Sequence, residues 1–327
     1  MTIVRWGLLS TANINRRLIP AIRSSARGRL VAVASRSQVT ADAYAAKWGI
    51  PQAFGSYESL LASESVDAVY VNVPNHLHAT WTLAALKNGK HVLCEKPFAL
   101  SLADVDAMAA AARSTGRVLA EAFMYRHHPQ IKLAGEWVRS GRLGQITLVR
   151  AIFGFNLSNR PNIRLDPATG GGCLWDVGVY PVSFAQYIMG GPPLRVHGAQ
   201  WLGATGVDED FAGQLIYAGG AVAQIAGSFR TPFNTFAEII GSEGRLTLNR
   251  PFVAGRDNVA REMLFHPDEG SPRPIPFGDA DPYLGEIEDM HAAILDGRPP
   301  TITLDETRLH VATVLALYDS ALERVNV

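Results

Sequence analysis

Short apolar runs alternate with helical patterns through the first 123 residues, and this alternation limits the folds open to the chain. The pattern begins with an apolar run at 4–10, a helical segment at 13–24 and a β-branched run at 30–35. Further strands and helices are expected to follow in turn, at 39–48, 56–63, 67–73, 79–88, 91–94, 101–114 and 118–122. Strands that alternate with helices form a parallel sheet covered on both faces. The sequence therefore predicts a doubly wound α/β domain over residues 1–123.

The pattern changes after residue 123. A helix is expected at 130–140, and long alternating stretches then predict strands, at 145–155, 196–202, 210–217, 221–229 and 237–240. Glycine-containing turns at 218–220 and 241–244 favour antiparallel pairing. Two more helices are expected, at 284–295 and 305–323, and a surface excursion rich in proline, glycine and charge at 251–276. Residues 124–327 are thus predicted to form an α+β domain with a largely antiparallel open sheet.

Composition supports two domains and excludes several functions. The 327 residues are enough for two separate cores. Equal numbers of basic and acidic residues, 30 of each, leave no long-range positive field for nucleic acid or an anionic membrane. The chain lacks an apolar run of the roughly 20 residues that a membrane span needs. Its two cysteines, Cys94 and Cys173, are too few for a disulfide framework or a structural zinc site. We expect a cytoplasmic protein without a bound metal.

The turn after the first strand has the position of a nucleotide-binding loop. In an open parallel sheet this turn offers backbone N–H groups and a helix N-terminus to a pyrophosphate. The usual G-x-G-x-x-G fingerprint is degraded, because Leu9 and Ala12 stand where its second and third glycines belong after Gly7. An alternative is that Gly7 only begins a tight turn. The other candidate phosphate contacts in the turn are Ser10, Thr11, Asn13 and Ile14.

The end of the second strand indicates which dinucleotide is bound. An acidic residue there would bind the adenine ribose 2′-hydroxyl and repel a 2′-phosphate. This chain has Ser35, Arg36 and Ser37 instead, and hydroxyls beside a guanidinium suit a phosphate monoester. We therefore predict NADP rather than NAD, with a solvated loop arginine as the alternative.

Three segments resemble one family of oxidoreductases. They are Val-Asn-Val-Pro-Asn-His-Leu-His at 71–78, Gly-Lys-His-Val-Leu-Cys-Glu-Lys-Pro at 89–97, and G-G-G-x-x-x-D-x-G-x-Y at 170–180. Over nearly its whole length the chain resembles the glucose-fructose oxidoreductase, inositol dehydrogenase and rhizopine catabolism family. The likeness is strongest to the subgroup of dimeric dihydrodiol dehydrogenase and NADP-dependent xylose dehydrogenase, which shares Gly-Ser-Tyr-Glu at 55–58.

This resemblance implies roles for the domains and for particular residues. Residues 1–123 would be an NADP-binding Rossmann domain, and 124–327 a substrate-binding domain that also forms a homodimer or homotetramer through its sheet. The implied catalytic group is Lys96, Asp176 and Tyr180. Further cofactor contacts are expected around the nicotinamide and adenine, at Tyr57, Val73, Pro74, Asn75, His78, Glu95, Lys96 and, from the second domain, Tyr283. Candidate substrate contacts are Tyr125, Arg126, Phe155, Asn156, Arg160 and Arg164, with hinge packing as the alternative for the first two.

The implied catalytic residues suit the oxidation of an alcohol. A base must take the hydroxyl proton while hydride leaves the same carbon for the nicotinamide. Tyrosine, with a pKa of about 10, needs a nearby cation to act as that base, and Lys96 can supply it. Asp176 lies four residues before Tyr180, so on a helix the two share a face, although Pro181 is expected to bend that helix. The alternatives are a core tyrosine and a helix-capping aspartate.

Together these observations predict an NADP(H)-dependent oxidoreductase. Hydride would pass between nicotinamide and a hydroxyl or carbonyl carbon of an aldose, a cyclic polyol or a dihydrodiol. A sugar-ketone reductase of the anhydrofructose or deoxysugar type would use the same residues. A non-catalytic NADP-binding sensor is an alternative from a different class.

Overall fold

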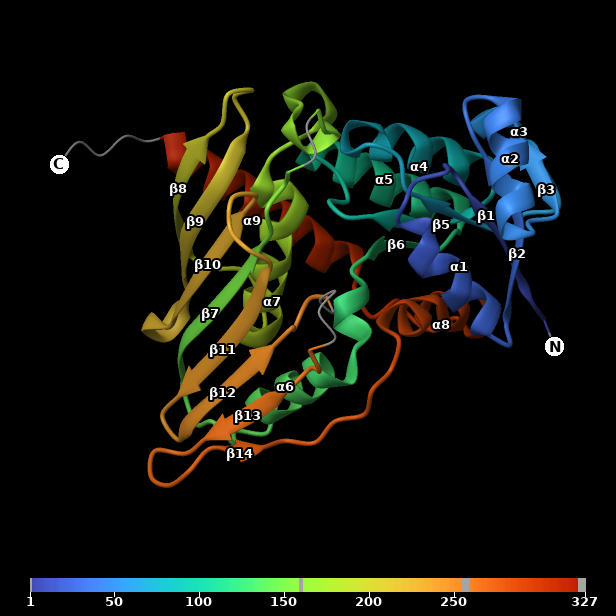
Figure 1. Cartoon of the computed structure of the whole chain (residues 1–327). Helices are drawn as coiled ribbons and strands as arrows, with labels where there is room; N and C mark the ends of the chain where they lie inside the picture. Colours follow the sequence, from blue (N-terminus) through green and yellow to red (C-terminus); the bar gives the residue numbers. More distant parts are fainter. Residues whose placement is uncertain (1, 159–160, 254–258, 323–327) are drawn as a thin grey trace. The chain divides into compact units, whose positions relative to one another are not determined.

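The computed structural model describes residues 2–158, 161–253 and 259–322, and the chain divides into two compact units (Figure 1). The first unit consists of Met1–His127 and Ala280–Arg308, and the second of His128–Asp279 and Leu309–Val327. This division differs in one respect from the single boundary expected after residue 123, because the chain returns to the first unit near its end.

The first unit is built on a six-stranded parallel sheet. Its strands, in sequence order, are β1 (Val4–Leu8), β2 (Gly28–Ala34), β3 (Gln52–Phe54), β4 (Ala68–Val71), β5 (His91–Glu95) and β6 (Leu119–Ala122). They pair in the order β3-β2-β1-β4-β5-β6, so the order reverses between β1 and β4. The predicted doubly wound sheet is confirmed, with the short edge strand β3 as an addition.

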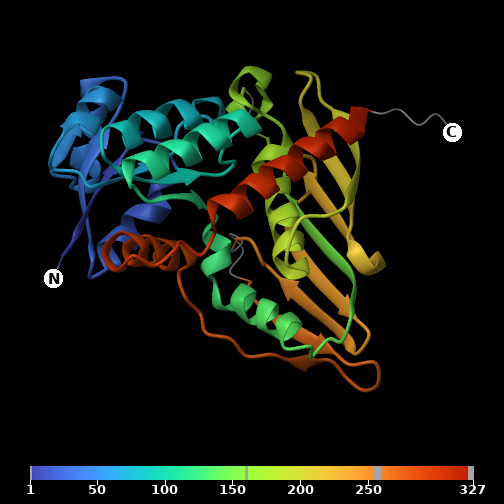
Figure 2. The ribbon, with the colours of Figure 1, turned by 180° about the vertical axis from the view of Figure 1, so that it is seen from behind.

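Helices cover both faces of this sheet. They are α1 (Asn15–Ser24), α2 (Gln38–Trp48), α3 (Tyr57–Ala62), α4 (His78–Lys87), α5 (Leu102–Thr115) and α8 (Pro282–Asp296), with short 3-10 turns at Asn75–Leu77 and Met124–His127. The pair α1 and α8 lies on one face and the pair α4 and α5 on the other, as Figures 1 and 2 show. Large side chains such as Trp6 and Tyr70 are fully buried between these layers.

Helix α8 belongs to the first unit because it completes that unit's core. Ile287 and Met290 are buried in the same cluster as Trp6. The Trp6 indole Nε1–H donates to Nε2 of His291 over 2.9 Å, and both side chains are fully buried. The apolar pattern of a helix does not show which domain the helix packs against. The sequence therefore predicts α8 as part of the second domain, like the residues on either side of it.

The second unit is built on an eight-stranded sheet. Its strands, in sequence order, are β7 (Ile146–Gly154), β8 (Arg195–Leu202), β9 (Asp208–Ile216), β10 (Val222–Ser228), β11 (Asn234–Gly241), β12 (Gly244–Asn249), β13 (Met263–His266) and β14 (Arg273–Pro274). All neighbours pair antiparallel except β7 and β10, which confirms the largely antiparallel sheet. The expectation of a surface excursion at 251–276 was wrong in part, because β13 and β14 extend the sheet edge there.

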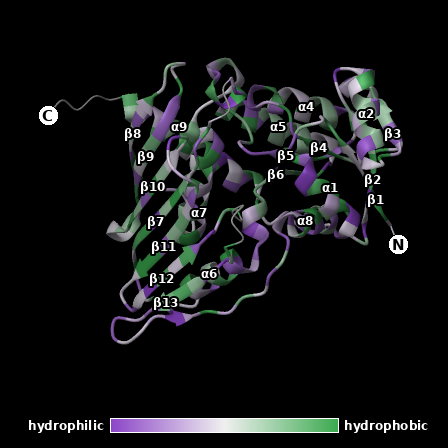
Figure 3. Ribbon diagram, in the orientation of Figure 1, coloured by the Kyte–Doolittle hydropathy of each residue, from purple (hydrophilic) through white to green (hydrophobic). Residues whose placement is uncertain are grey.

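One face of the second sheet carries helices. These are α6 (Pro129–Arg139), α7 (Val179–Met189) and most of α9 (Leu304–Leu322), and Figure 2 shows them in front of the strands. A π-helical turn (Leu174–Gly178) leads into α7 and contacts β9 and β10. Buried aromatic side chains, among them Phe153 of β7 and Phe252, join the sheet to α7. The hydropathy colours in Figure 3 show hydrophobic residues along several strands of this sheet.

Among the residues that the structure describes, no helix is long and apolar enough to cross a lipid bilayer.

Candidate functional site

Hydrogen bonds join the loops that follow β1 and β4, where the strand order reverses. The Ser10 hydroxyl donates to Oδ1 of Asn72 over 2.9 Å and accepts from the Ala12 amide over 3.0 Å. Asn15, at the start of α1, donates to the Ser10 carbonyl over 2.8 Å and accepts from the Asn72 amide. The single hydroxyl proton of Ser10 is therefore used within the loop and is not available to a phosphate, so the expected phosphate contact of this side chain is corrected. Sequence analysis missed Asn15 and Asn72.

The glycine and leucine of the degraded fingerprint have packing roles. Gly7 lies within β1, and a Cβ there would come 3.0 Å from Leu60 and 3.1 Å from Val66. The absent side chain is therefore explained by the close approach of α3. The Leu9 side chain is fully buried, so only its backbone could meet a ligand. These two positions do not offer side chains to a cofactor.

The remaining loop residues lead to the N-terminus of α1, which has no side-chain cap in the described part of the chain. Thr11, Ala12 and Ile14 are half-buried, and Asn13 is exposed. Among the described residues, the first turn of α1 also lacks an acidic side chain. The amides of Asn15, Arg16 and Arg17 donate to carbonyls of the preceding turn, so α1 offers an anion at the carboxyl edge of the sheet the positive end of its dipole rather than these N–H groups.

The end of β2 carries an exposed arginine. Ser35 is buried, whereas Arg36 and Ser37 are exposed. Tyr57, at the start of α3, stands edge-on to Trp81 with ring centroids 4.8 Å apart. Burial raises the pKa of Tyr57, and the charge of nearby Arg36 opposes that shift. An exposed guanidinium beside aromatic rings fits an adenine nucleotide that carries a 2′-phosphate.

Hydrogen bonds to two glutamates fix the chain after β5, which carries Lys96. Tyr70 donates its hydroxyl proton to Glu95, and the other Glu95 oxygen accepts from the Lys96 amide over 3.2 Å. Glu121 on β6 accepts from the Phe98 amide over 3.1 Å and from the Thr307 hydroxyl over 3.0 Å. The two carboxyl groups thus fix the backbone around half-buried Lys96.

His78 has a different role from the one expected. Its side chain is 1% exposed, and its ring nitrogens lie 2.7 Å from the Pro97 carbonyl and 2.8 Å from the Val73 carbonyl. The expected cofactor contact is corrected, because a buried ring with both nitrogens engaged cannot reach a ligand. His78 instead holds the loop after β4, with half-buried Pro74 and Asn75, against the chain that follows Lys96.

Tyr283 lies in the first unit rather than the second. It follows the α8 N-cap Asp281, whose carboxylate accepts from the Tyr283 amide over 3.0 Å, and it packs on the same core cluster as Ile14. Burial, with the charge of Glu95, raises the pKa of Tyr283. The expected approach from the second domain is corrected, because α8 covers the parallel sheet.

In the second unit, Asp176 and Tyr180 lie on consecutive helical turns. Asp176 is in the π-helical turn, and Tyr180 is the second residue of α7. The change of helix type falls just before Tyr180, so Pro181 sits in the first turn of α7, where proline is tolerated. Arg164 donates from Nε to Asp176 over 2.6 Å, and the charges of Asp176 and then Tyr180 raise the pKa of Arg164. A carboxylate, a guanidinium and a phenol therefore form one polar group.

A buried aspartate that sequence analysis missed holds this segment in place. Asp208 accepts from the Leu174 amide over 2.7 Å, from the Cys173 thiol over 3.1 Å and from the Tyr318 hydroxyl over 2.8 Å. A Cβ at Gly172, where φ is +126°, would come 2.2 Å from Asp208. The glycine run thus lets the chain approach Asp208 closely. An acidic residue at the start of a strand gave no signal of this role.

The candidate substrate residues fall into two groups. Tyr125 is edge-on to Phe123 with centroids 5.8 Å apart, and Arg126 forms an ion pair with Glu306, which supports the packing alternative for both. In the second unit, Phe155 is half-buried, Asn156 is exposed and Arg164 reaches Asp176. Residue 160 lies outside the described part of the chain.

Comparisons with known proteins match both units. A family model described as an oxidoreductase family with an NAD-binding Rossmann fold matches residues 4–123, and the GFO/IDH/MocA C-terminal domain model matches 131–247. D-xylose 1-dehydrogenase (NADP(+)) 2 of Haloferax volcanii is 38% identical over 97% of each chain. Mouse trans-1,2-dihydrobenzene-1,2-diol dehydrogenase is 34% identical over 76% of each chain. The crystal structure of KijD10, a 3-ketoreductase from Actinomadura kijaniata in complex with NADP and TDP-benzene, is 29% identical with a TM-score of 0.89 over 98% of each chain.

The carboxyl group of Glu121 makes the stability of the first unit depend on pH. Burial raises the pKa of Glu121 to about 8, against 4.5 as its ordinary value. Between these two pH values the folded chain holds a proton that the unfolded chain has released. The free energy of unfolding should therefore fall as pH rises, by up to about 1.4 kcal/mol per pH unit. Glu121→Gln should remove this part of the decline.

Chemical unfolding of wild type and Glu121→Gln across this range measures the difference. Glu64→Gln, at an exposed glutamate of the same unit, is the matched control and should follow the wild type. Equal slopes for wild type and Glu121→Gln would contradict the buried, protonated carboxyl.

Proposed function

Because the chain belongs to the GFO/IDH/MocA family of oxidoreductases, we propose that it transfers hydride between NADP(H) and a hydroxyl or carbonyl carbon of a sugar, cyclic polyol or dihydrodiol. The observation that carries this proposal is the likeness to an NADP-dependent xylose dehydrogenase over 97% of both chains. The relative that acts on a dihydrodiol supports the breadth of the substrate class. A cytoplasmic location, in keeping with two free, buried cysteines, is part of the proposal.

The residues for NADP come from the carboxyl edge of the parallel sheet. The pyrophosphate would meet the N-terminus of α1, and Arg36 with Ser35 and Ser37 would bind the 2′-phosphate. Tyr57 would border the adenine, and Tyr283 the nicotinamide side of the same unit. When bound, NADP supplies the acceptor or donor of the hydride.

The proposed catalytic group combines Lys96 of the first unit with Asp176 and Tyr180 of the second. The Tyr180 oxygen takes the substrate hydroxyl proton during oxidation and returns one during reduction. A cation favours the phenolate, and both Lys96 and Arg164 can supply that charge. Asp176 orients Arg164 and is suited to bind a neighbouring substrate hydroxyl.

Two substituted residues of KijD10 support this assignment, because they are as far apart in sequence as Lys96 and Tyr180 are here. Its solved structures include substitutions of one lysine and one tyrosine that are 84 positions apart. Lys96 and Tyr180 are also separated by 84 positions here. That relative is a ketoreductase, so its likeness also favours the second candidate function, reduction of a sugar ketone by the same residues in the reverse direction.

Association of copies through the second sheet is also proposed. Val149, Ala151 and Phe153 of β7 are buried, whereas the alternate residues Leu148 and Ile152 are only half-buried. In the register these two lie opposite Ile240 and Phe236 of β11. The face away from the helices thus carries half-buried apolar residues on both sides of the Arg150–Glu238 ion pair, and this mixed surface supports a homodimer or homotetramer.

Replacement of Arg36 tests the choice of cofactor. Arg36→Ala should weaken NADP binding by about 10- to 100-fold, because a charge-assisted contact to the 2′-phosphate is lost, and should leave NAD binding unchanged. Isothermal titration with each dinucleotide gives both affinities. Arg29→Ala is a matched control, since it removes the same charge from an exposed position near the other end of β2. An unaltered ratio of NADP to NAD affinity would remove the assignment.

Replacement of Tyr180 tests the proton carrier. A spectrophotometric screen of NADP reduction with aldoses, cyclic polyols and dihydrodiols first identifies a substrate. Tyr180→Phe should then lower kcat by about 10²- to 10⁴-fold with NADP affinity intact, because the general base is lost. Tyr187→Phe removes a hydroxyl from the same helix and should keep its activity.

Survival of Tyr180→Phe activity within a few fold would show that another group carries the proton. Tight NADP binding with no turnover in the screen would favour the non-catalytic sensor.

A further inference from the structure

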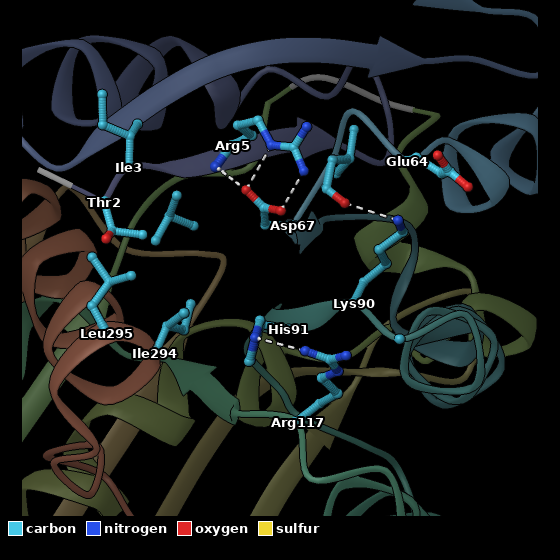
Figure 4. Close-up of a pocket in the computed structure, with 13 residues that line it drawn as sticks. Thr2, Ile3, Arg5, Glu64, Asp67, Lys90, His91, Arg117, Ile294 and Leu295 are labelled. Carbon is cyan, nitrogen blue, oxygen red and sulfur yellow. Dashed lines mark hydrogen bonds and ion pairs between the residues drawn. The ribbon is translucent and has the colours of Figure 1, made fainter.

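A cavity lies at the amino edge of the parallel sheet, opposite the nucleotide loops. It has a volume of about 570 Å³ and is formed entirely by residues of the first unit. Its walls come from the amino ends of β1, β4 and β5, from Arg117 two residues before β6, and from the end of α8, as Figure 4 shows. Because the nucleotide loops follow the carboxyl ends of the same strands, this cavity is separate from the proposed cofactor site.

Two of its three cationic side chains are already used by the fold. Arg5 binds Asp67 through two side-chain contacts, of 2.9 Å from Nε and 2.7 Å from Nη2. The Lys90 ammonium donates to the carbonyls of Ser63 over 2.6 Å and Val66 over 2.8 Å. The end of α3, whose carbonyls favour a cation, is thus satisfied by Lys90. Arg117 is the third cation.

Arg117 faces a histidine that cannot accept a hydrogen bond from it. The Val118 amide donates to Nδ1 of His91 over 2.9 Å, so Nδ1 carries no proton and the neutral ring carries its proton on Nε2. Burial, with the charge of Arg117, lowers the pKa of His91 to about 4, which keeps the ring neutral near pH 7. Nε2 lies 3.4 Å from Nη1 of Arg117. Both atoms are donors, because a guanidinium has no acceptor.

Arg117 is exposed and His91 is half-buried, and two donors side by side at the wall of a cavity favour an acceptor between them. The lining has a formal charge of plus one, since Arg5, Lys90 and Arg117 outnumber Asp67 and exposed Glu64. Asp67 is held by Arg5, so the charge of Arg117 is not neutralised by that carboxylate. An oxygen with a negative charge, placed between Nε2–H and the guanidinium, would accept from both.

We propose that this cavity binds a small oxyanion, the phosphate or carboxylate group of a metabolite, between Arg117 and His91. Inorganic phosphate and acetate are the simplest probes of the two oxyanion types. The site does not depend on the proposed oxidoreductase function, and it would stabilise the first unit in proportion to occupancy.

Titration of the full chain with inorganic phosphate and, separately, with acetate tests the proposal. At least one should bind wild type at millimolar concentration, and Arg117→Ala should weaken that binding by about tenfold or more. Arg113→Ala removes the same charge from an exposed position on α5 outside the cavity and should bind as wild type does. Both titrations are run with saturating NADP, which fills the proposed 2′-phosphate site at Arg36, so that binding of the probe there is not measured.

Equal binding by wild type and Arg117→Ala, or no binding of either probe, would overturn the proposal. A proton–nitrogen spectrum of the histidine rings tests the premise separately. His91 should show its proton on Nε2, with a shift of that signal when the anion binds to wild type. A proton on Nδ1 would remove the donor pair, and with it the site.

Discussion

Parallel pairing of β1, β4 and β5 brings their carboxyl ends to one edge of the sheet, and the first unit depends on this constraint. The loop at Ser10, the loop after Asn72 and the chain at Lys96 follow those three strands. Buried side chains then fix the loops against one another: Ser10 and Asn72 by a direct hydrogen bond, and the chain at Lys96 through Glu121 and His78. A covered parallel sheet therefore supplies a rigid support for both the nucleotide loop and the proposed catalytic lysine.

In the second unit, a single buried carboxylate fixes the segment that carries the proposed catalytic residues. Asp208 accepts from the backbone and thiol at the start of the π-helical turn and from Tyr318 of α9. Removal of such a buried carboxylate would leave its donors unsatisfied, which costs about 1–3 kcal/mol each. The turn that carries Asp176, and the helix that carries Tyr180, are thus anchored to β9 and α9. The ion pair of Asp176 with Arg164 places a cation near the phenol within one unit.

Sequence patterns predicted the helices and strands better than the contacts that these elements make with one another. Alternating strands and helices identified both sheets, because hydrophobic periodicity is a local property. The place of α8 and the depth of His78 depend on contacts between residues far apart in the chain, such as Trp6 with His291 and His78 with Pro97. Periodicity does not record such contacts. Arg36 could be identified as a candidate cofactor contact because its position at the end of the second strand is visible in the sequence. Asp208 and Glu121 act through hydrogen bonds to residues that are distant in the sequence and meet only in the fold.

The central proposal is that Lys96 and Tyr180 act on one substrate proton. Values of kcat/KM for Lys96→Met, Tyr180→Phe and the double variant, measured with one substrate from the screen, test it most directly. If the two residues work as a unit, the double variant should be no slower than the slower single variant. Multiplication of the two single losses in the double variant would contradict a shared role.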